Sequence, residues 1–81
     1  MINQDQIIHL LQKEIYHISN VKVESITENL LSDRLGIDLV YFLYVFSNFK
    51  ESTGIPVHNI FRSLSANEFT LQRISELILA L

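Results

Sequence analysis

The sequence predicts a small all-α domain, and three observations favour that fold class. Its 81 residues are 48% apolar with a formal net charge of −3, a balance typical of a folded globule. Two glycines and one proline are too few for the many turns of an all-β fold. Apolar residues recur every three or four positions in several segments, as they do in helices. We therefore expect one helical domain over residues 1–81.

The first helix is expected from about Gln4 to Ile18. Asn3 and Gln6 have the spacing of a capping box, although Asp5 has the chemistry of a cap as well. Apolar side chains recur at i, i+4, i+8 and i+11 and so share one face of this helix: Ile7, Leu11, Ile15 and Ile18.

A long ordered loop is expected over residues 19–37, with one helical turn at most. Loops of this length are uncommon in so small a domain and often serve function. The loop has four isolated apolar residues that we expect to anchor it: Ile26, Leu30, Leu31 and Leu35.

The second helix is expected to begin after Asp38, which has the chemistry of an N-cap, and to end at about Thr53, before Gly54. The β-branched and aromatic residues between Tyr41 and Phe46 would also suit a strand. Because the apolar spacing continues as far as Phe49, a helix is the better prediction.

Two further helices complete the chain. A short third helix is expected over Val57 to Leu64, with Ile60, Phe61 and Leu64 facing inward, followed by a connection over residues 65–69. Thr70 is the expected cap of a last helix, whose apolar stripe is Leu71, Ile74, Leu77, Ile78 and Leu81. The predicted core contains Ile7, Leu11, Ile15, Phe42, Phe46, Phe49, Ile74 and Ile78.

This order of elements, with Leu35-Gly36-Ile37-Asp38 at the opening of the second helix, resembles that of acyl carrier proteins. The resemblance implies a four-helix bundle with a long loop between helices 1 and 2 and a short third helix. In that family the residue after the aspartate is a serine that carries phosphopantetheine. Here that position is Leu39, so the resemblance implies a degenerate member without the arm or any other cofactor.

An alternative alignment would place Asp33-Arg34-Leu35 on the same motif, and helix geometry decides between the two. The family buries residues about six, ten and fourteen positions after the serine. Counted from Leu39, these positions are Val45, Phe49 and Thr53, and they share the apolar side of the helix with Leu39, Phe42 and Phe46. Counted from Arg34, they are Val40, Tyr44 and Asn48, on the polar side. The first alignment is therefore preferred, and neither supplies a serine.

The resemblance extends over nearly the whole chain, because Thr53-Gly54-Ile55 matches the end of helix 2 and Phe69-Thr70-Leu71 the start of the last helix. The chain also resembles, more narrowly, the acyl-carrier-related proteins found beside bacterial peptide-maturation enzymes, which often lack the serine.

Recognition is expected to differ from that of a conventional carrier. The family's partners bind acidic side chains on the exposed face of helix 2, and three of the four matching positions here are not acidic: Tyr41, Tyr44 and Lys50, with Glu51 as the fourth. Attraction by negative charge should be weak and apolar contact strong. We therefore expect a partner-binding surface made of Val40, Tyr41, Leu43 and Tyr44.

Several other classes of site are disfavoured. The chain has no cysteine, and His9, His17 and His58 are expected to face solvent and not to hold a metal. No nucleophile–base pair or phosphate loop indicates an enzyme. The six basic residues do not cluster, which disfavours nucleic acid as a partner. Because no segment is typical of a signal peptide or a membrane span, we expect a cytoplasmic protein.

The function expected from the sequence is that of a non-catalytic, acyl-carrier-like interaction protein that docks on an enzyme through helix 2, or forms a weak homodimer there. Peptide maturation or secondary metabolism is the expected setting. Two alternatives stay open: a true acyl or peptidyl carrier with its attachment serine displaced to Ser32, and a plain helical-bundle regulator. Ser47 is a weaker attachment candidate, because it lies mid-helix.

Overall fold

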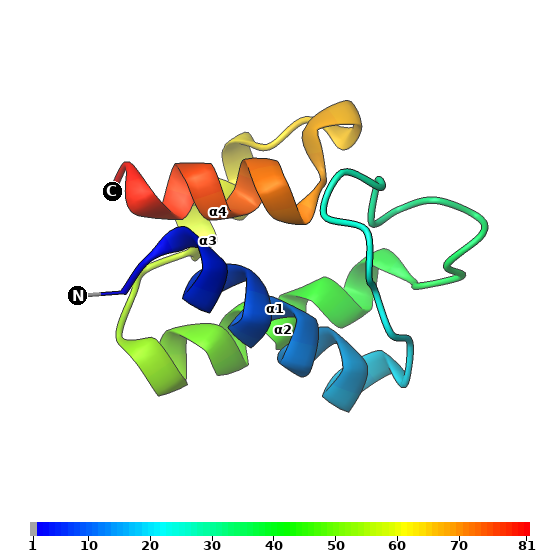
Figure 1. Ribbon diagram of the computed structural model, residues 1–81, viewed down its shortest axis with the longest axis horizontal. Coiled ribbons are helices and arrows are strands. Elements are labelled where there is room, and N and C mark those ends of the chain that lie inside the picture. Colours follow the sequence, from blue (N-terminus) through cyan, green and yellow to red (C-terminus); the bar gives the residue numbers. More distant parts are fainter. Residues whose placement is uncertain (1) are drawn as a thin grey trace.

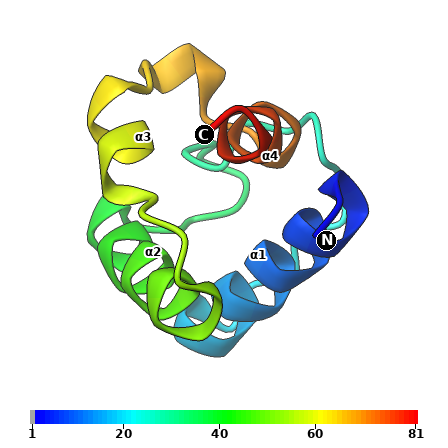
Figure 2. The same ribbon diagram turned by 90° about the vertical axis from the view of Figure 1, so that its left-hand side faces the viewer.

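The computed structural model describes residues 2–81, and within that range the chain is helical with no strand (Figure 1). The elements are α1 (Gln4–Ser19), α2 (Leu39–Thr53), α3 (His58–Ser63), the 3₁₀ turn η1 (Ala66–Glu68) and α4 (Leu71–Leu79). The predicted all-α class is confirmed. Seen along α4, the four helices surround a common centre, with α1 in contact with both α2 and α4 and with α3 against α4 (Figure 2).

The helix ends lie where local chemistry predicts them. Asn3 accepts a hydrogen bond from the backbone N–H of Gln6, whose side chain accepts one from the backbone N–H of Asn3, so the capping box is complete. Gly54 ends α2 in the left-handed conformation at φ 74°, which an L side chain rarely adopts. Thr70 caps α4 by accepting from the N–H of Arg73.

Residues 20–38 form the expected long loop, and it supplies more of the core than the sequence indicated. Leu30 and Leu35 are buried as predicted and Leu31 is half-buried, whereas Ile26 is exposed, so its predicted role as an anchor is wrong. Val23 and Ile37 are also buried, although neither was among the predicted anchors.

Hydrogen bonds tie this loop to the segment between α3 and α4. The backbone N–H of Leu30 donates to the carbonyl of Phe69 at 2.7 Å, and the side-chain amide of Asn29 donates to the carbonyl of Ala66 at 2.6 Å. The N–H of Gln72, in the first turn of α4, donates to the carbonyl of Ile26 at 2.9 Å. Two connections far apart in sequence therefore support each other.

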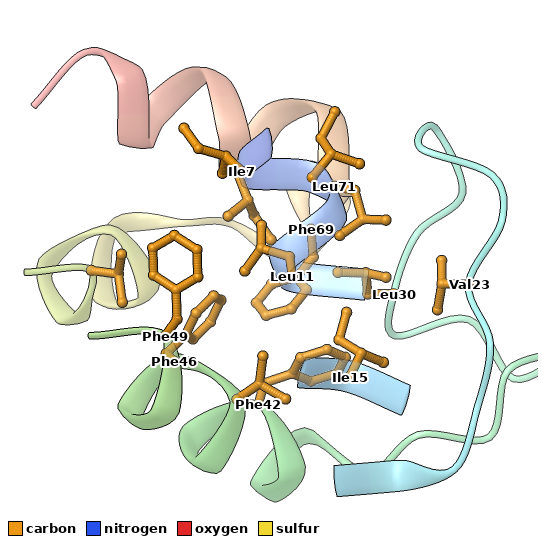
Figure 3. Packing of buried hydrophobic residues seen from close by; sticks show 14 of the residues in the cluster. Ile7, Leu11, Ile15, Val23, Leu30, Phe42, Phe46, Phe49, Phe69 and Leu71 are labelled. Atoms are coloured by element: carbon orange, nitrogen blue, oxygen red, sulfur yellow. The ribbon is translucent and has the colours of Figure 1, made fainter. Parts of the chain in front are cut away.

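The buried side chains form one cluster between the helices (Figure 3). All eight residues of the predicted core are buried. Phe69, from the connection before α4, packs edge-on against Phe42 with ring centroids 5.0 Å apart, and Phe46 packs similarly against Phe61 at 5.2 Å. These rings join α2 to α3 and to the connection that follows it.

Two predictions near the helix ends are wrong. Leu39 was expected on the apolar side of α2, yet 51% of its surface is exposed, because it opens the helix and the loop residues Leu35 and Ile37 are buried instead. Leu81, predicted in the apolar stripe of the last helix, lies beyond α4 and is exposed. Phe61 and Leu64 are half-buried and pack against the core, in agreement with their predicted inward facing. The connection predicted over residues 65–69 contains the 3₁₀ turn η1.

Candidate functional site

The first two turns of α2 are apolar on every side but are buried on only one. Residues 39–46 are Leu-Val-Tyr-Phe-Leu-Tyr-Val-Phe, and the two tyrosine hydroxyls are the only polar side-chain groups among them. The core takes the side chains that recur at i, i+3, i+4 and i+7: Phe42, Val45, Phe46 and Phe49. A helix that is hydrophobic all round is normally covered all round.

The uncovered side chains form what we call the α2 apolar face, which consists of Leu39, Val40, Tyr41, Leu43 and Tyr44. Between 40% and 58% of the surface of each residue is exposed, and Tyr44 is the most exposed. The four residues proposed from the sequence are thus all on the outside of the helix. Leu39 is a fifth member that the sequence analysis missed, because its spacing placed it with the core stripe.

Two rows of side chains cross this face. Residues four apart lie one above the other on a helix, which places Leu39 beside Leu43 and Val40 beside Tyr44. The next residues in the two rows are Ser47 and Asn48, so the apolar character stops after two turns. Beyond them Lys50 and Glu51 are exposed to solvent.

Charged residues lie at both ends of α2: Asp38 at its start, and Lys50 followed by Glu51 near its end. Asp38 is exposed, and its side chain caps the helix by accepting a hydrogen bond from the N–H of Val40 at 3.0 Å. Lys50 lies three turns further along. Within residues 2–81, neither side chain takes part in an ion pair.

Ser32, the alternative attachment residue, has its hydroxyl engaged within the loop. The Ser32 side chain is half-buried, and its Oγ accepts a hydrogen bond from the backbone N–H of Arg34 at 3.2 Å. The Arg34 guanidinium forms a two-pronged ion pair with Glu28, and this hydrogen bonding, more than the charge itself, lowers the pKa of the Glu28 carboxyl. Ser47 is exposed, in the third turn of α2.

Other residues of chemical interest are not assembled into a site. The three histidines are exposed, as predicted, and residues 2–81 contain no group of three metal-ligating side chains. Ser75 is the one buried polar side chain in that range. Its hydroxyl donates to the carbonyl of Gln72 and accepts from the Gln4 side chain at 3.1 Å, so it holds α4 against the start of α1.

An apolar groove lies where the start of α1, the segment between α2 and α3, and the end of α4 meet. It is an open groove, not an enclosed cavity, and hydrocarbon side chains line nearly all of it, among them Ile2, Ile55, Ile78 and Leu81. No charged side chain is among its lining residues.

Comparisons with protein-family models, with curated proteins and with solved structures each returned no match. Among residues 2–81, no helix combines the length and the apolar character that crossing a membrane requires.

Proposed function

We propose that this protein is a non-catalytic, acyl-carrier-like accessory protein that lacks a phosphopantetheine arm and docks on a partner enzyme through α2. The enzyme is expected to act in peptide maturation or secondary metabolism. The proposal combines the resemblance in the sequence with the character of the α2 apolar face.

One observation carries the docking role: five large apolar or aromatic side chains lie together on the outside of one helix, uncovered over two turns. Scattered exposed hydrophobic residues are normal on a protein surface, but a contiguous apolar patch is typical of an interaction site. Tyrosine is also enriched at interfaces, because its ring supplies contact area and its hydroxyl stays hydrated.

Two observations support a role without an arm. Leu39 stands at the position where the family carries its serine, and it has no oxygen to be modified. Ser32 is half-buried with its hydroxyl accepting a local hydrogen bond, a setting that does not favour access by a modifying enzyme. The displaced-serine carrier therefore has no specific observation in its favour.

Affinity purification of the tagged protein from its own cells, with quantitative mass spectrometry of what is captured, tests the proposal. We compare the wild type with the double variant Tyr41→Ser/Tyr44→Ser. The matched control is Tyr16→Ser, because Tyr16 lies on α1 and is 53% exposed, about as much as Tyr44. One enzyme should be captured by the wild type and by the control, and lost at least tenfold from the double variant. Capture that survives the double substitution, or an intact mass increased by a phosphopantetheine arm, would overturn the proposal.

A further inference from the structure

The straight part of the long loop, residues 21–25, carries backbone groups that the rest of the fold does not pair. It contains no turn and no bend, and Figure 1 shows it running from the end of α1 towards the start of α4. None of the backbone N–H groups of residues 22–29 donates to another group within residues 2–81. Folded proteins leave only about 10% of their backbone groups to water, so an unpaired run of this length is unusual.

The sequence of this segment is typical of a β-strand. Val21-Lys22-Val23-Glu24 alternates β-branched residues with charged ones. The exposure alternates in the same way, because Val21 is half-buried and Val23 is buried, whereas Lys22 and Glu24 are exposed. A period of two indicates an extended backbone. Since residues 2–81 form no sheet, the segment resembles an edge strand without a neighbour.

One edge of the segment is attached to the fold, and the other edge has no partner. The side-chain amide of Gln12, on α1, donates to the carbonyl of Val23 at 3.0 Å, and the Val23 side chain belongs to the core cluster (Figure 3). In an extended chain the backbone groups of successive residues point to opposite edges. Those of Lys22 and Glu24 therefore point away from α1, and they form no hydrogen bond within residues 2–81. Because the core holds the segment in place, little order has to be gained on binding.

We propose that residues 21–25 bind an extended peptide segment, which pairs with Lys22 and Glu24 as an added antiparallel strand. Each of these two residues exchanges a pair of backbone hydrogen bonds with one residue of the peptide. A peptide is the occupant because another extended backbone presents N–H and C=O groups at the same spacing. The segment shares no residue with the α2 apolar face, and the inference does not rest on the proposed function.

The charges of the segment specify which peptide fits. Lys22 and Glu24 have their charged groups 3.7 Å apart, and their side chains are 77% and 78% exposed. An exposed pair of this kind contributes little stability, so both groups are free to face charges on a partner. Opposite charges directly across two strands are favourable. In the antiparallel orientation the preferred peptide therefore has the order Lys-x-Glu, with x across from Val23.

NMR titration of the ¹⁵N-labelled full chain with the synthetic peptide acetyl-Ser-Thr-Lys-Val-Glu-Thr-Ser-amide tests the proposal. The amide signals of Lys22 and Glu24 should shift most. A short two-stranded pair is marginally stable, so we expect a dissociation constant on the order of 1 mM and titrate to about 5 mM. A peptide with its Lys and Glu exchanged should bind about 2- to 30-fold more weakly, because both cross-strand pairs then bring like charges together.

Methylation of the peptide nitrogens distinguishes backbone pairing from other kinds of binding and leaves the protein unchanged. The N–H groups of the peptide's Lys and Glu face the segment in the proposed pairing, so methylating both nitrogens should abolish binding. The N–H of the central Val faces away, and methylating it should leave the dissociation constant nearly unchanged.

Variants of the protein test the charges and the place of binding. The double variant Lys22→Glu/Glu24→Lys should reverse the preference and bind the exchanged peptide more tightly. Lys13→Gln is the control for binding elsewhere, because Lys13 lies on α1 and lines the hollow between α1 and residues 22–24. This control and Tyr41→Ser/Tyr44→Ser should bind as the wild type does.

Three results would overturn the proposal: no shift of the Lys22 and Glu24 signals, binding that survives methylation of the Lys and Glu nitrogens, or binding lost in Lys13→Gln. Shifts of these signals with protein concentration in the absence of peptide would assign the edge to a second copy of the chain. That result would also overturn the peptide as the occupant.

Discussion

Leu39 is the first helical residue of α2, and half of its surface is exposed. A hydroxyl at this position would lie beside the N-terminus of the helix, where free backbone N–H groups and the helix dipole favour an approaching phosphate. Leucine presents only hydrocarbon there. The position is therefore accessible but chemically inert, because phosphopantetheine transfer needs an oxygen that attacks the pyrophosphate of coenzyme A.

The substitution Leu39→Ser tests whether the backbone around this residue still suits the modification. We expect the wild type to stay unmodified and Leu39→Ser to be modified slowly by a promiscuous phosphopantetheinyl transferase, because the acidic side chains that such enzymes bind are largely absent. Adding Tyr41→Asp and Tyr44→Glu should increase the rate by restoring electrostatic attraction, and added salt should remove that gain. Intact-protein mass spectrometry over time gives the rates.

A modified wild type would contradict this expectation, and peptide mapping would then identify the serine. An arm on Ser32 would mean that the alignment on Leu39 is wrong and that the protein is a carrier. Ser47→Ala is the control for attachment in the third turn of α2.

The exposure of individual residues was predictable in the middle of a helix and not at its start. Tyr44 has a turn of helix on either side, so its periodicity fixes which way it points. Leu39 has no helical turn before it, and its exposure depends on the path of the loop that precedes it. Periodicity carries no information about that path, and the burial of Ile37 was missed for the same reason.

At the scale of the element, α2 has one face that packs in the core and another that is apolar but uncovered. The two faces need different tests, because substitutions on the core face should change stability and those on the outer face should change association. Phe49 is fully buried on the core face, whereas Tyr44 is the most exposed residue of the outer one.

We expect Phe49→Ala to lower the free energy of unfolding by about 3–5 kcal/mol, since it removes a buried ring and leaves a cavity. A domain of this size has little more stability than that, so the variant should be largely unfolded at 25 °C. Urea denaturation followed by circular dichroism measures the change. Tyr44→Ala, on the same helix, should change stability by no more than about 0.5 kcal/mol. Equal losses in the two variants would mean that the facing of α2 is wrong.

Helix boundaries were largely predictable because capping is local chemistry. The capping box of Asn3 and Gln6 depends on residues within one turn, as do the roles of Asp38, Gly54 and Thr70. The turn η1 has no side-chain hydrogen bond to its first N–H groups that a sequence motif would reveal. Its contacts are partly local, from the Ser65 hydroxyl to Asn67 and Glu68, and partly long-range, from the Asn29 side chain to the carbonyl of Ala66.

At the scale of the whole molecule, the fold depends on the long loop as much as on the helices. Residues 20–38 contribute buried side chains to the core and hydrogen bonds to the segment before α4. The order of helices could be predicted from the sequence, because each helix has its own periodicity. The pairing of the loop with residues 66–72 could not, since neither segment contains a pattern that specifies its partner.

Glutamate ion pairs reinforce both of these connections, and they make stability depend on pH. Glu28 pairs with Arg34 inside the loop. Glu68, in η1, accepts a hydrogen bond from Ser65 at 2.6 Å and lies 3.3 Å from Arg73, at the start of α4. The hydrogen bond from Arg34 holds the pKa of Glu28 below its ordinary value, and the bond from Ser65, followed by that from Arg73, does the same to the pKa of Glu68.

A carboxyl whose pKa is lower in the folded than in the unfolded chain binds fewer protons when folded, so stability rises with pH through the window between the two values. We therefore expect the free energy of unfolding to be constant above about pH 5.5 and to fall as the pH drops below the ordinary glutamate value of about 4.3. Urea denaturation at a series of pH values measures this.

The double variant Glu28→Gln/Glu68→Gln should lower stability at neutral pH and flatten the acid dependence, because the groups that release protons on folding are gone. The control is Glu51→Gln, because Glu51 is exposed and has no ion pair among residues 2–81; it should retain the wild-type slope of stability against pH. An unchanged slope in the double variant would mean that the acid sensitivity arises outside these two connections.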